Sequence, residues 1–174
     1  MMRDVTIVSH QSAWKGKFES VKRDLIKFLP DARIHHIGST SVNGLMAKPI
    51  IDILIEVPSL ERMDELTGEF KSLGYIGRGE NGIENRRFFY KGEGNEREVH
   101  LHIFPYGIHH VIRHLAFRDY LRSHMEEAKK YGALKAKLAR EFPRDMEGYI
   151  EGKDRFVKDM EKKALTWYKK EADR

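Results

Sequence analysis

The stretch His36-Ile37-Gly38-Ser39-Thr40-Ser41-Val42-Asn43-Gly44-Leu45-Met46-Ala47-Lys48-Pro49-Ile50-Ile51-Asp52-Ile53 carries the strongest structural signal in the chain. It includes parts of two segments rich in Ile and Val, Arg33 to Ile37 and Pro49 to Val57, and both have the composition of strands. Between them, residues 38–44 are a run of turn-forming residues. The sequence therefore predicts two strands joined by a polar loop, with Asp52 on the second strand.

Amphipathic periodicity predicts one helix before this pair of strands and another after it. Apolar residues recur at three-to-four spacing from Trp14 to Leu29, and Pro30 marks the end of that helix. The second helix is predicted to run from a cap at Ser59 to a stop at Gly74. Each helix has an apolar stripe that can cover one face of a sheet.

Further strands are predicted in the middle of the chain. A short strand is expected at 75–77, and glycine-rich turns bracket a segment from Arg86 to Lys91. A segment of alternating apolar and polar residues follows from Arg97 to Phe104. We expect these last two segments to form an antiparallel pair.

The remainder of the chain, from His109 onward, has helical periodicity and is expected to form three helices. The last two are separated at Phe142-Pro143, because proline disfavours a helical conformation in the residue before it. Strands in the first two thirds and helices in the last third predict an α+β fold, with the helices packed on a small mixed sheet. Its 174 residues suit a single domain, with a sheet-containing part at 1–108 and a basic helical part at 109–174.

The charge is distributed unevenly. The net charge is +5, but residues 1–112 carry 15 basic and 15 acidic residues, whereas residues 113–174 carry 17 basic and 12 acidic ones. A basic surplus suits a partner that bears phosphate, although a solvated helical surface has the same composition. Acidic residues are interleaved throughout this part, so nucleic acid is the less favoured partner.

Composition also excludes several classes of protein. The chain has no Cys, which excludes disulfides, thiolate catalysis and zinc-thiolate sites. Its apolar runs are only a few residues long, far short of the ~18 that a membrane span needs. Arg3 and Asp4 interrupt the N-terminal apolar residues, unlike the order of a secretory signal. We therefore expect a cytoplasmic protein without a membrane partner.

The quoted stretch resembles the GrpB family, in which His-Ile-Gly-Ser-Thr precedes a Val-x-Gly-Leu turn and Ala-Lys-Pro-x-Ile-Asp-Ile lies on the next strand. The resemblance extends over nearly the whole chain, including Phe88, His100 to His102, Leu115 to Arg122, Tyr131, Leu134-Lys135, Lys153 and Phe156. It implies a nucleotidyltransferase-like α+β fold of the polymerase β type. Members of this family also occur fused to dephospho-CoA kinase, which implies a ligand of the CoA type as an alternative to a nucleotide.

In a nucleotidyltransferase fold, a Gly-Ser pair at the end of a strand holds the triphosphate, and carboxylates on the next strand hold Mg²⁺. Gly38, Ser39 and the adjacent Thr40 match the phosphate loop, and Asp52 matches the first carboxylate and is the predicted catalytic residue. The second carboxylate of the usual Asp-x-Asp pattern is absent, because Leu54 stands there. A standard two-metal mechanism is therefore not expected.

Histidines are the candidates to replace the missing ligand. Glu98, His100 and His102 alternate on one face of the predicted strand, where His100 and His102 can meet Asp52 across the sheet, and His36 is a further candidate. The cofactor expected is a divalent metal, with Mg²⁺ or Mn²⁺ favoured by the fold and Zn²⁺ suited to imidazole ligands. Half-exposed strand histidines without a metal, or histidines that contact phosphate directly, remain the alternatives.

Basic side chains supply the remaining phosphate-binding candidates. Arg118 and Arg122 stand four residues apart on one predicted helix face, and Arg can bind phosphate oxygens in bidentate fashion. The other candidates are Lys48, Arg87, Lys135 and Lys153. Tyr120, Tyr131 and Tyr149 could stack on a base or contact a ribose.

Two functional hypotheses follow. The first is a protein that binds a nucleoside triphosphate and, with the help of a metal, transfers a nucleotidyl or phosphoryl group, in which case it is a transferase. The second is a binding module without catalysis for a nucleotide or a CoA-type ligand, favoured by the missing carboxylate. Loss of nucleotide binding in Asp52→Asn distinguishes the first from the second.

Overall fold

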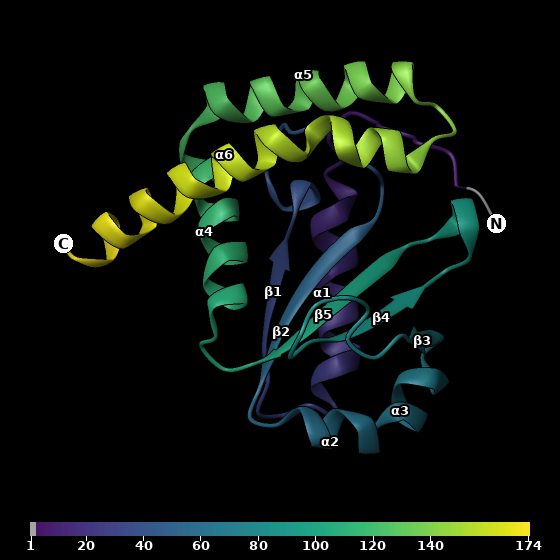
Figure 1. Ribbon diagram of the computed structural model, residues 1–174. Helices are drawn as coiled ribbons and strands as arrows, with labels where there is room; N and C mark the ends of the chain where they lie inside the picture. The colour runs from purple at the N-terminus through teal and green to yellow at the C-terminus, as the bar shows by residue number, and fades with distance from the viewer. Residues whose placement is uncertain (1–2) are drawn as a thin grey trace.

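A five-stranded mixed sheet lies at the centre of the fold (Figure 1). The computed structural model describes residues 3–174. The strands are β1 (Arg33–Ile37), β2 (Ile51–Val57), β3 (Tyr75–Gly77), β4 (Arg87–Lys91) and β5 (Val99–Pro105), in the spatial order β1-β2-β5-β4-β3. Only β2 and β5 run parallel to each other; the other three neighbouring pairs are antiparallel.

Helices occupy both faces of this sheet. They are α1 (Ala13–Ile26), α2 (Leu60–Glu65), α3 (Thr67–Ser72), α4 (His109–Ser123), α5 (Met125–Glu141) and α6 (Met146–Ala172), with two short 3₁₀ turns, η1 (Ser39–Ser41) and η2 (Gly94–Glu96). The mixed sheet and the C-terminal helical segment confirm the α+β fold predicted from the sequence.

The single helix predicted from Ser59 to Gly74 is wrong, because it is divided into α2 and α3 at Leu66. The backbone of Leu66 leaves the helical region, with φ −93° and ψ 11°. The hydroxyl of Thr67 donates a hydrogen bond to the carbonyl oxygen of Asp64, three residues earlier. A Thr side chain that binds a nearby carbonyl competes with the backbone bonds of a helix, which gives this break a local cause.

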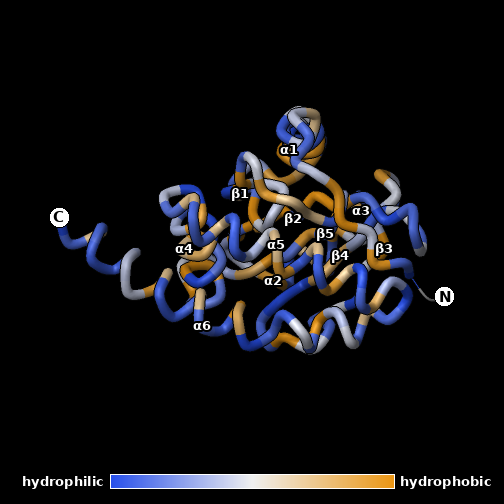
Figure 2. Tube along the Cα trace, turned by 90° about the horizontal axis from the view of Figure 1, so that it is seen from above, coloured by the Kyte–Doolittle hydropathy of each residue, from blue (hydrophilic) through white to orange (hydrophobic). Residues whose placement is uncertain are grey.

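Alternation along the strands gives the two faces of the sheet different characters. The α1 face carries Ile51, Ile53 and Ile55 of β2 and Val99, Leu101 and Ile103 of β5, and it packs against α1, α2 and α3 in the largest core cluster. The other face carries Asp52, Leu54 and Glu56 of β2 and His100, His102 and Phe104 of β5. Figure 2 shows α1 on one side of the sheet and α6 on the other. The polar side chains of β2 and β5 therefore lie on the face turned toward α4, α5 and α6.

The last three helices form a layer of their own above this polar face (Figure 1). Helix α6 packs along α4 and α5 through an apolar cluster that includes Tyr131, Met160 and Ala164. Its C-terminal end extends beyond the rest of the molecule and is mainly hydrophilic (Figure 2). Within residues 3–174, no helix is both long enough and apolar enough to cross a membrane.

Phe70 provides a test of the core on the α1 face. Its side chain is fully buried, and its ring stacks on Phe89 at a centroid distance of 4.1 Å and meets Phe28 edge to face at 5.1 Å. We expect Phe70→Ala to lower the free energy of unfolding by about 3–5 kcal/mol, measured by urea denaturation. Ile76→Ala is the control, because Ile76 is 40% exposed; an equal loss in both variants would contradict this assignment of the core.

Candidate functional site

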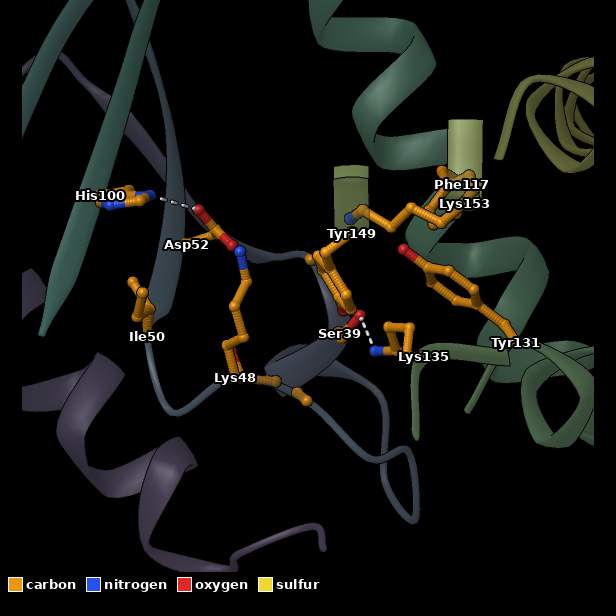
Figure 3. Close-up of a pocket in the computed structure, with 13 residues that line it drawn as sticks. Ser39, Lys48, Ile50, Asp52, His100, Phe117, Tyr131, Lys135, Tyr149 and Lys153 are labelled. Atoms are coloured by element: carbon orange, nitrogen blue, oxygen red, sulfur yellow. Dashed lines mark hydrogen bonds and ion pairs between the residues drawn. The ribbon is translucent and has the colours of Figure 1, made fainter. Parts of the chain in front are cut away.

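A cavity of about 280 Å³ opens between the polar face of the sheet and the helical layer (Figure 3). The loop after β1, strands β2 and β5, and helices α4, α5 and α6 all contribute side chains to it. The lining consists of Gly38, Ser39, Thr40, Ala47, Lys48, Ile50, Asp52, His100, Phe117, Tyr131, Lys135, Tyr149 and Lys153. Eight of these residues are among the site residues predicted from the sequence, and they come together from four separate parts of the chain.

Gly38 lets the loop after β1 pass close to β2. Its φ of +73° lies in the left-handed region, and a Cβ atom at this position would lie 2.9 Å from Asp52 Oδ2. Any other residue would therefore be strained and would also collide with the carboxylate. The Ser41 hydroxyl donates a hydrogen bond of 2.5 Å to the Gly38 carbonyl oxygen, which closes the turn into η1. The loop thus places Ser39 at the cavity beside Asp52.

Three lysines surround the cavity with few negative charges near them. Lys135 Nζ donates a hydrogen bond of 2.6 Å to Ser39 Oγ and lies 4.5 Å from the centre of the Tyr131 ring. Lys48 Nζ and Lys153 Nζ lie 5.5 Å and 5.4 Å from the centre of the Tyr149 ring. None of the three forms an ion pair within the described residues 3–174. Their partners are the aromatic rings, the Ser39 hydroxyl and, for Lys48 Nζ, the Met146 sulfur at 3.8 Å.

Burial and mutual repulsion lower the pKa values of two of these amines. Burial, followed by the charges of Lys153 and Lys48, lowers the pKa of Lys135 from 10.5 to about 7. Burial, followed by the charge of Lys153, lowers the pKa of Lys48 to about 8. A bound polyanion would remove both penalties, because it supplies the negative charge that this cluster lacks.

Asp52, His100 and His102 form a compact group on the polar face. In the parallel register of β2 and β5, Asp52 is paired with His100, and His102 is one pleat further along β5. Asp52 Oδ1 lies 3.5 Å from His100 Nδ1 and 3.1 Å from His102 Nε2. Burial alone would raise the pKa of Asp52, but the hydrogen bonds to His100 and His102 outweigh it and hold the pKa below its ordinary value.

This group has the geometry and donor types of a divalent metal site. One ligand atom from each of the three residues can be chosen so that all three atoms lie within 4.8 Å of one another. His100 Nε2 is buried and has no hydrogen-bond partner within residues 3–174. Two imidazoles and one carboxylate suit Zn²⁺, Mn²⁺ or Fe²⁺ better than Mg²⁺. By these criteria the residues fit a metal ion.

Arg86 opposes metal binding at one of the three ligands. Its Nη1 lies 3.2 Å from His102 Nδ1, and a guanidinium can only donate, so Nδ1 is the acceptor and the ring proton is on Nε2. Metal-bound histidines usually donate their second ring N–H to an acceptor. Arg86 is buried and is held by the carbonyl oxygens of Glu80 and Asn81. Coordination through His102 Nε2 therefore competes with this contact.

The residue that stands in place of the second carboxylate of the Asp-x-Asp pattern, Leu54, lies in the hydrophobic core. Leu54 is fully buried and packs with Ile37, Phe104 and Val111 beneath α4. Glu56, one pleat further along β2, is also buried and pairs with His35 at 2.8 Å. It contributes to the structure at the far end of β2 and does not line the cavity.

Five predicted residues do not line the cavity: His102, which lies beside Asp52, and His36, Arg87, Arg118 and Arg122. The structure does not bring His36 together with Asp52, His100 and His102: alternation along β1 turns it to the α1 face, where it contacts Phe18 and hydrogen bonds with Thr40. Its pKa is lowered to about 4, first by burial and then by Arg122. Arg87 forms an ion pair with Asp64 at 2.8 Å on the α1 face, away from the cavity.

Arg118 and Arg122 contact the backbone around the loop. Arg118 Nη1 donates to the carbonyl oxygen of His36 at 3.2 Å, and Arg122 Nε donates to that of Ser41 at 3.0 Å. Asp119 also accepts a hydrogen bond from Arg118 Nε and so orients its guanidinium. Neither arginine lines the cavity, and their positions support the loop that carries Ser39.

Sequence reasoning did not identify Arg86, although it contacts His102. Its position depends on the turn between β3 and β4, where Asn81 and Asn85 adopt positive φ angles, and no periodic pattern specifies that turn. The ring of His114 packs behind the site, with its centre 5.7 Å from that of the His102 ring. Burial lowers its pKa well below the ordinary value, so it is a neutral packing residue behind the site.

Comparisons with known proteins agree on the family and the fold. The family model described as GrpB protein matches residues 4–163. The UPF0157 protein YqkA of Bacillus subtilis (strain 168) is 45% identical over 169 residues, which is 96% of this chain and 49% of that protein. This chain therefore spans about half the length of that relative.

Solved structures are similar as well. The crystal structure of conserved protein GrpB from Enterococcus faecalis has a TM-score of 0.89 and 40% identity, covering 94% of this chain and 99% of that one. A structure of the Cid1 poly(U) polymerase bound to MgATP has a TM-score of 0.50 and 13% identity, covering 75% of this chain and 41% of that one. The second likeness concerns the fold alone, and it is the nucleotidyltransferase fold predicted from the sequence.

The lowered pKa of Lys135 predicts a pH dependence of stability. Between about pH 7 and 10.5 the unfolded chain binds a proton at Lys135 that the folded chain does not, so the free energy of unfolding rises with pH in this window. Lys135→Met removes this contribution, and the slope is expected to fall by up to about 1.4 kcal/mol per pH unit. Urea denaturation at several pH values measures it. Lys130→Met, at an exposed position of α5, is the control; equal slopes in the two variants would contradict the prediction.

The contact between Arg86 and His102 predicts an unusual effect on metal affinity. Arg86→Gln places a carbonyl oxygen that can accept the Nδ1 proton of His102, so we expect Mn²⁺ and Zn²⁺ to bind about tenfold more tightly. Isothermal titration calorimetry measures the affinity. Arg87→Gln changes the next residue, which lies on the opposite face, and is expected to have no effect. Weaker metal binding in Arg86→Gln would overturn the assigned tautomer.

Proposed function

The chain belongs to the GrpB family, and we propose that it binds a nucleoside triphosphate in the cavity beside Ser39 and transfers a nucleotidyl or phosphoryl group from it. The observation that carries the proposal is the convergence of Lys48, Lys135 and Lys153 with the Ser39 hydroxyl on one cavity. Among residues 3–174, Asp52 is the single carboxylate that lines it. A chain of phosphates is the common ligand that best matches several amines and a hydroxyl at this spacing.

The loop after β1 supplies the phosphate contacts. Ser39 and Thr40 follow the left-handed Gly38, so their backbone can approach a phosphate closely. Lys135 already donates to Ser39 Oγ, which fixes both groups at the cavity before a ligand arrives. Preorganised donors of this kind stabilise the charge that a leaving phosphate gains as its bond to the transferred group breaks.

The size of the cavity indicates which part of the nucleotide it holds. At about 280 Å³ it is near the lower limit of pockets that enclose a small-molecule ligand. We propose that it takes the triphosphate, while the rings of Phe117, Tyr131 and Tyr149 at its border offer stacking surfaces to the nucleoside.

Asp52, His100 and His102 would hold the divalent metal. Such an ion would neutralise phosphate charge and orient the reacting group. The single carboxylate and the two imidazoles favour Mn²⁺ or Zn²⁺, although Mg²⁺ is the ion that the fold leads one to expect. The lysines have a role separate from that of the metal in this proposal, because they hold the phosphate chain. Asp52 lies next to the loop that positions the phosphate chain.

A module that binds the same ligands without catalysis is the second candidate. Two observations favour it: Leu54 occupies the place of the second carboxylate, and Arg86 competes with a metal for His102. In that case nucleotides or CoA-type ligands would bind through the lysines alone, and the affinity would not depend on Asp52 or on a metal.

Thermal unfolding with ligands separates these possibilities. The measurement ranks ligands by the shift in Tm that each produces with EDTA, Mg²⁺, Mn²⁺ or Zn²⁺. The ligands are the four nucleoside triphosphates, CoA and dephospho-CoA. A ligand at about 100 times its Kd stabilises the folded state by roughly 2.7 kcal/mol, which corresponds to a shift of several degrees in a chain of this size. The proposal predicts a shift with a triphosphate that requires a divalent ion.

Variants assign that shift to the site. Asp52→Asn is expected to abolish the metal-dependent part, and Lys135→Met to weaken triphosphate binding at least tenfold through loss of a charged contact. Asp159→Asn, at an exposed position of α6, is the matched control and should behave as wild type. A shift that persists in Asp52→Asn and in EDTA supports the module without catalysis, and no shift with any ligand overturns both candidates.

A further inference from the structure

A second, smaller cavity of about 100 Å³ lies next to the one described above, and Lys48 and Ile50 line both. It is formed by the N-terminal segment of the chain and by the connection between β4 and β5. Arg3 and Arg97 face it from these two segments. Ser39 and Lys135 line only the first cavity, so Lys48 stands between the two pairs of residues.

Both arginines have hydrogen-bonding groups without a partner. Arg3 Nη1 and Arg97 Nε are buried nitrogen atoms that donate to nothing within residues 3–174. A buried donor of a charged group that lacks an acceptor is costly, and proteins rarely leave one so. Finding two such donors at one small cavity indicates that a ligand supplies the acceptors.

No carboxylate of the described chain neutralises this pair of arginines. Asp4 also lines this cavity, but it accepts a hydrogen bond of 3.0 Å from Asn95 Nδ2 and lies 3.9 Å from Arg144 Nε. Glu96 and Glu98, which flank Arg97 in the sequence, are both exposed. Arg97 instead lies over the Tyr90 ring, 3.9 Å from its centre. Burial and the charge of Arg97 both lower the pKa of Arg3, which shows that the two guanidinium groups interact unfavourably.

Arg97 lies near the end of the first cavity at which Asp52 and His100 are found. Tyr90, which supports its guanidinium, is the register partner of His100 in the pairing of β4 with β5. The charge of Arg97 is one of those that act on His100. An anion held by Arg3 and Arg97 would therefore lie beside the Asp52 and His100 end of the first cavity, on the far side of Lys48 from Ser39.

We propose that Arg3 and Arg97 form a second anion subsite, which binds a phosphate group on the acceptor substrate. This assignment rests on the proposed function: the donor triphosphate lies with Ser39 and Lys135, and the acceptor enters from the side of Arg97. Two guanidinium groups with Lys48 nearby match a phosphate monoester, which carries up to two negative charges and several acceptor oxygens. A carboxylate offers only one charge.

The surroundings favour a small ligand over a polymer. Glu93, Glu96 and Glu98 are exposed on the same connection between β4 and β5 that carries Arg97. Their charges would repel the extended phosphate backbone of a nucleic acid. The acceptor is therefore a phosphorylated small molecule.

Site-resolved NMR titration with inorganic phosphate tests the subsite in the full chain. In the wild type we expect the Arg97 Nε–H signal and the Ser39 amide signal both to shift, one for each cavity. Arg97→Gln should weaken phosphate binding at the Arg3 side by about tenfold and leave the response of Ser39 unchanged. Lys135→Met should weaken the response of Ser39 to phosphate and leave the response of Arg97 unchanged. Arg23→Gln, at an exposed position of α1, is the matched control.

The outcomes separate this subsite from the proposed function. If the Arg97 signal does not respond to phosphate, or if acetate shifts it as strongly, the assignment of a phosphate subsite is overturned. The same NMR titration is repeated with the nucleoside triphosphates. If Arg97 responds to phosphate but Ser39 responds to no triphosphate, the subsite stands and the transferase proposal fails. Thermal unfolding of Arg97→Gln without phosphate is expected to show no loss of stability, because the substitution relieves repulsion; a large loss would assign Arg97 a structural role instead.

Discussion

The close approach of the Gly38 backbone to the Asp52 carboxylate is the contact on which the rest of the site depends. It requires a left-handed residue without a side chain immediately after β1. It also brings the Ser39 hydroxyl beside Asp52, the only carboxylate among the described residues that line the cavity. Arg118 and Arg122 stabilise the same arrangement from α4 by donating to carbonyl oxygens at His36 and Ser41. The helical layer therefore both closes the cavity and holds the loop in place.

Charge is the second constraint, and it is balanced only in part by the protein. Lys48, Lys135 and Lys153 face the cavity together with one acid, whose own charge is already used by two imidazoles. Burying amines without counterions costs stability, and here the cost appears as the lowered pKa values of Lys48 and Lys135. Functional sites accept such costs when a ligand repays them on binding, which is why the electrostatics point to a polyanion.

Much of this architecture could be predicted from the sequence, because it depends on local patterns. Periodicity located the strands and the long helices, and the alternation of His100 and His102 correctly placed both beside Asp52. The structure does not place His36 beside Asp52, because the register of β1 and β2 pairs Ile37, and not His36, with Asp52. The contacts of Arg86, Arg3 and Arg97 depend on turns and on segments distant in sequence, and no local pattern reports such contacts.

The replacement of the second carboxylate changes what the site can do. With Leu54 in the core, the second and third candidate ligands come from β5 instead of β2, and both are imidazoles. Arg86 keeps the proton of His102 on the nitrogen that faces Asp52, so a metal must displace that proton to bind there. A carboxylate pair would bind Mg²⁺ without this competition. The site is therefore built for a metal that binds imidazole strongly, or for a pair of hydrogen-bonded groups that works without a metal, and the affinity of Arg86 variants for Mn²⁺ and Zn²⁺ decides between them.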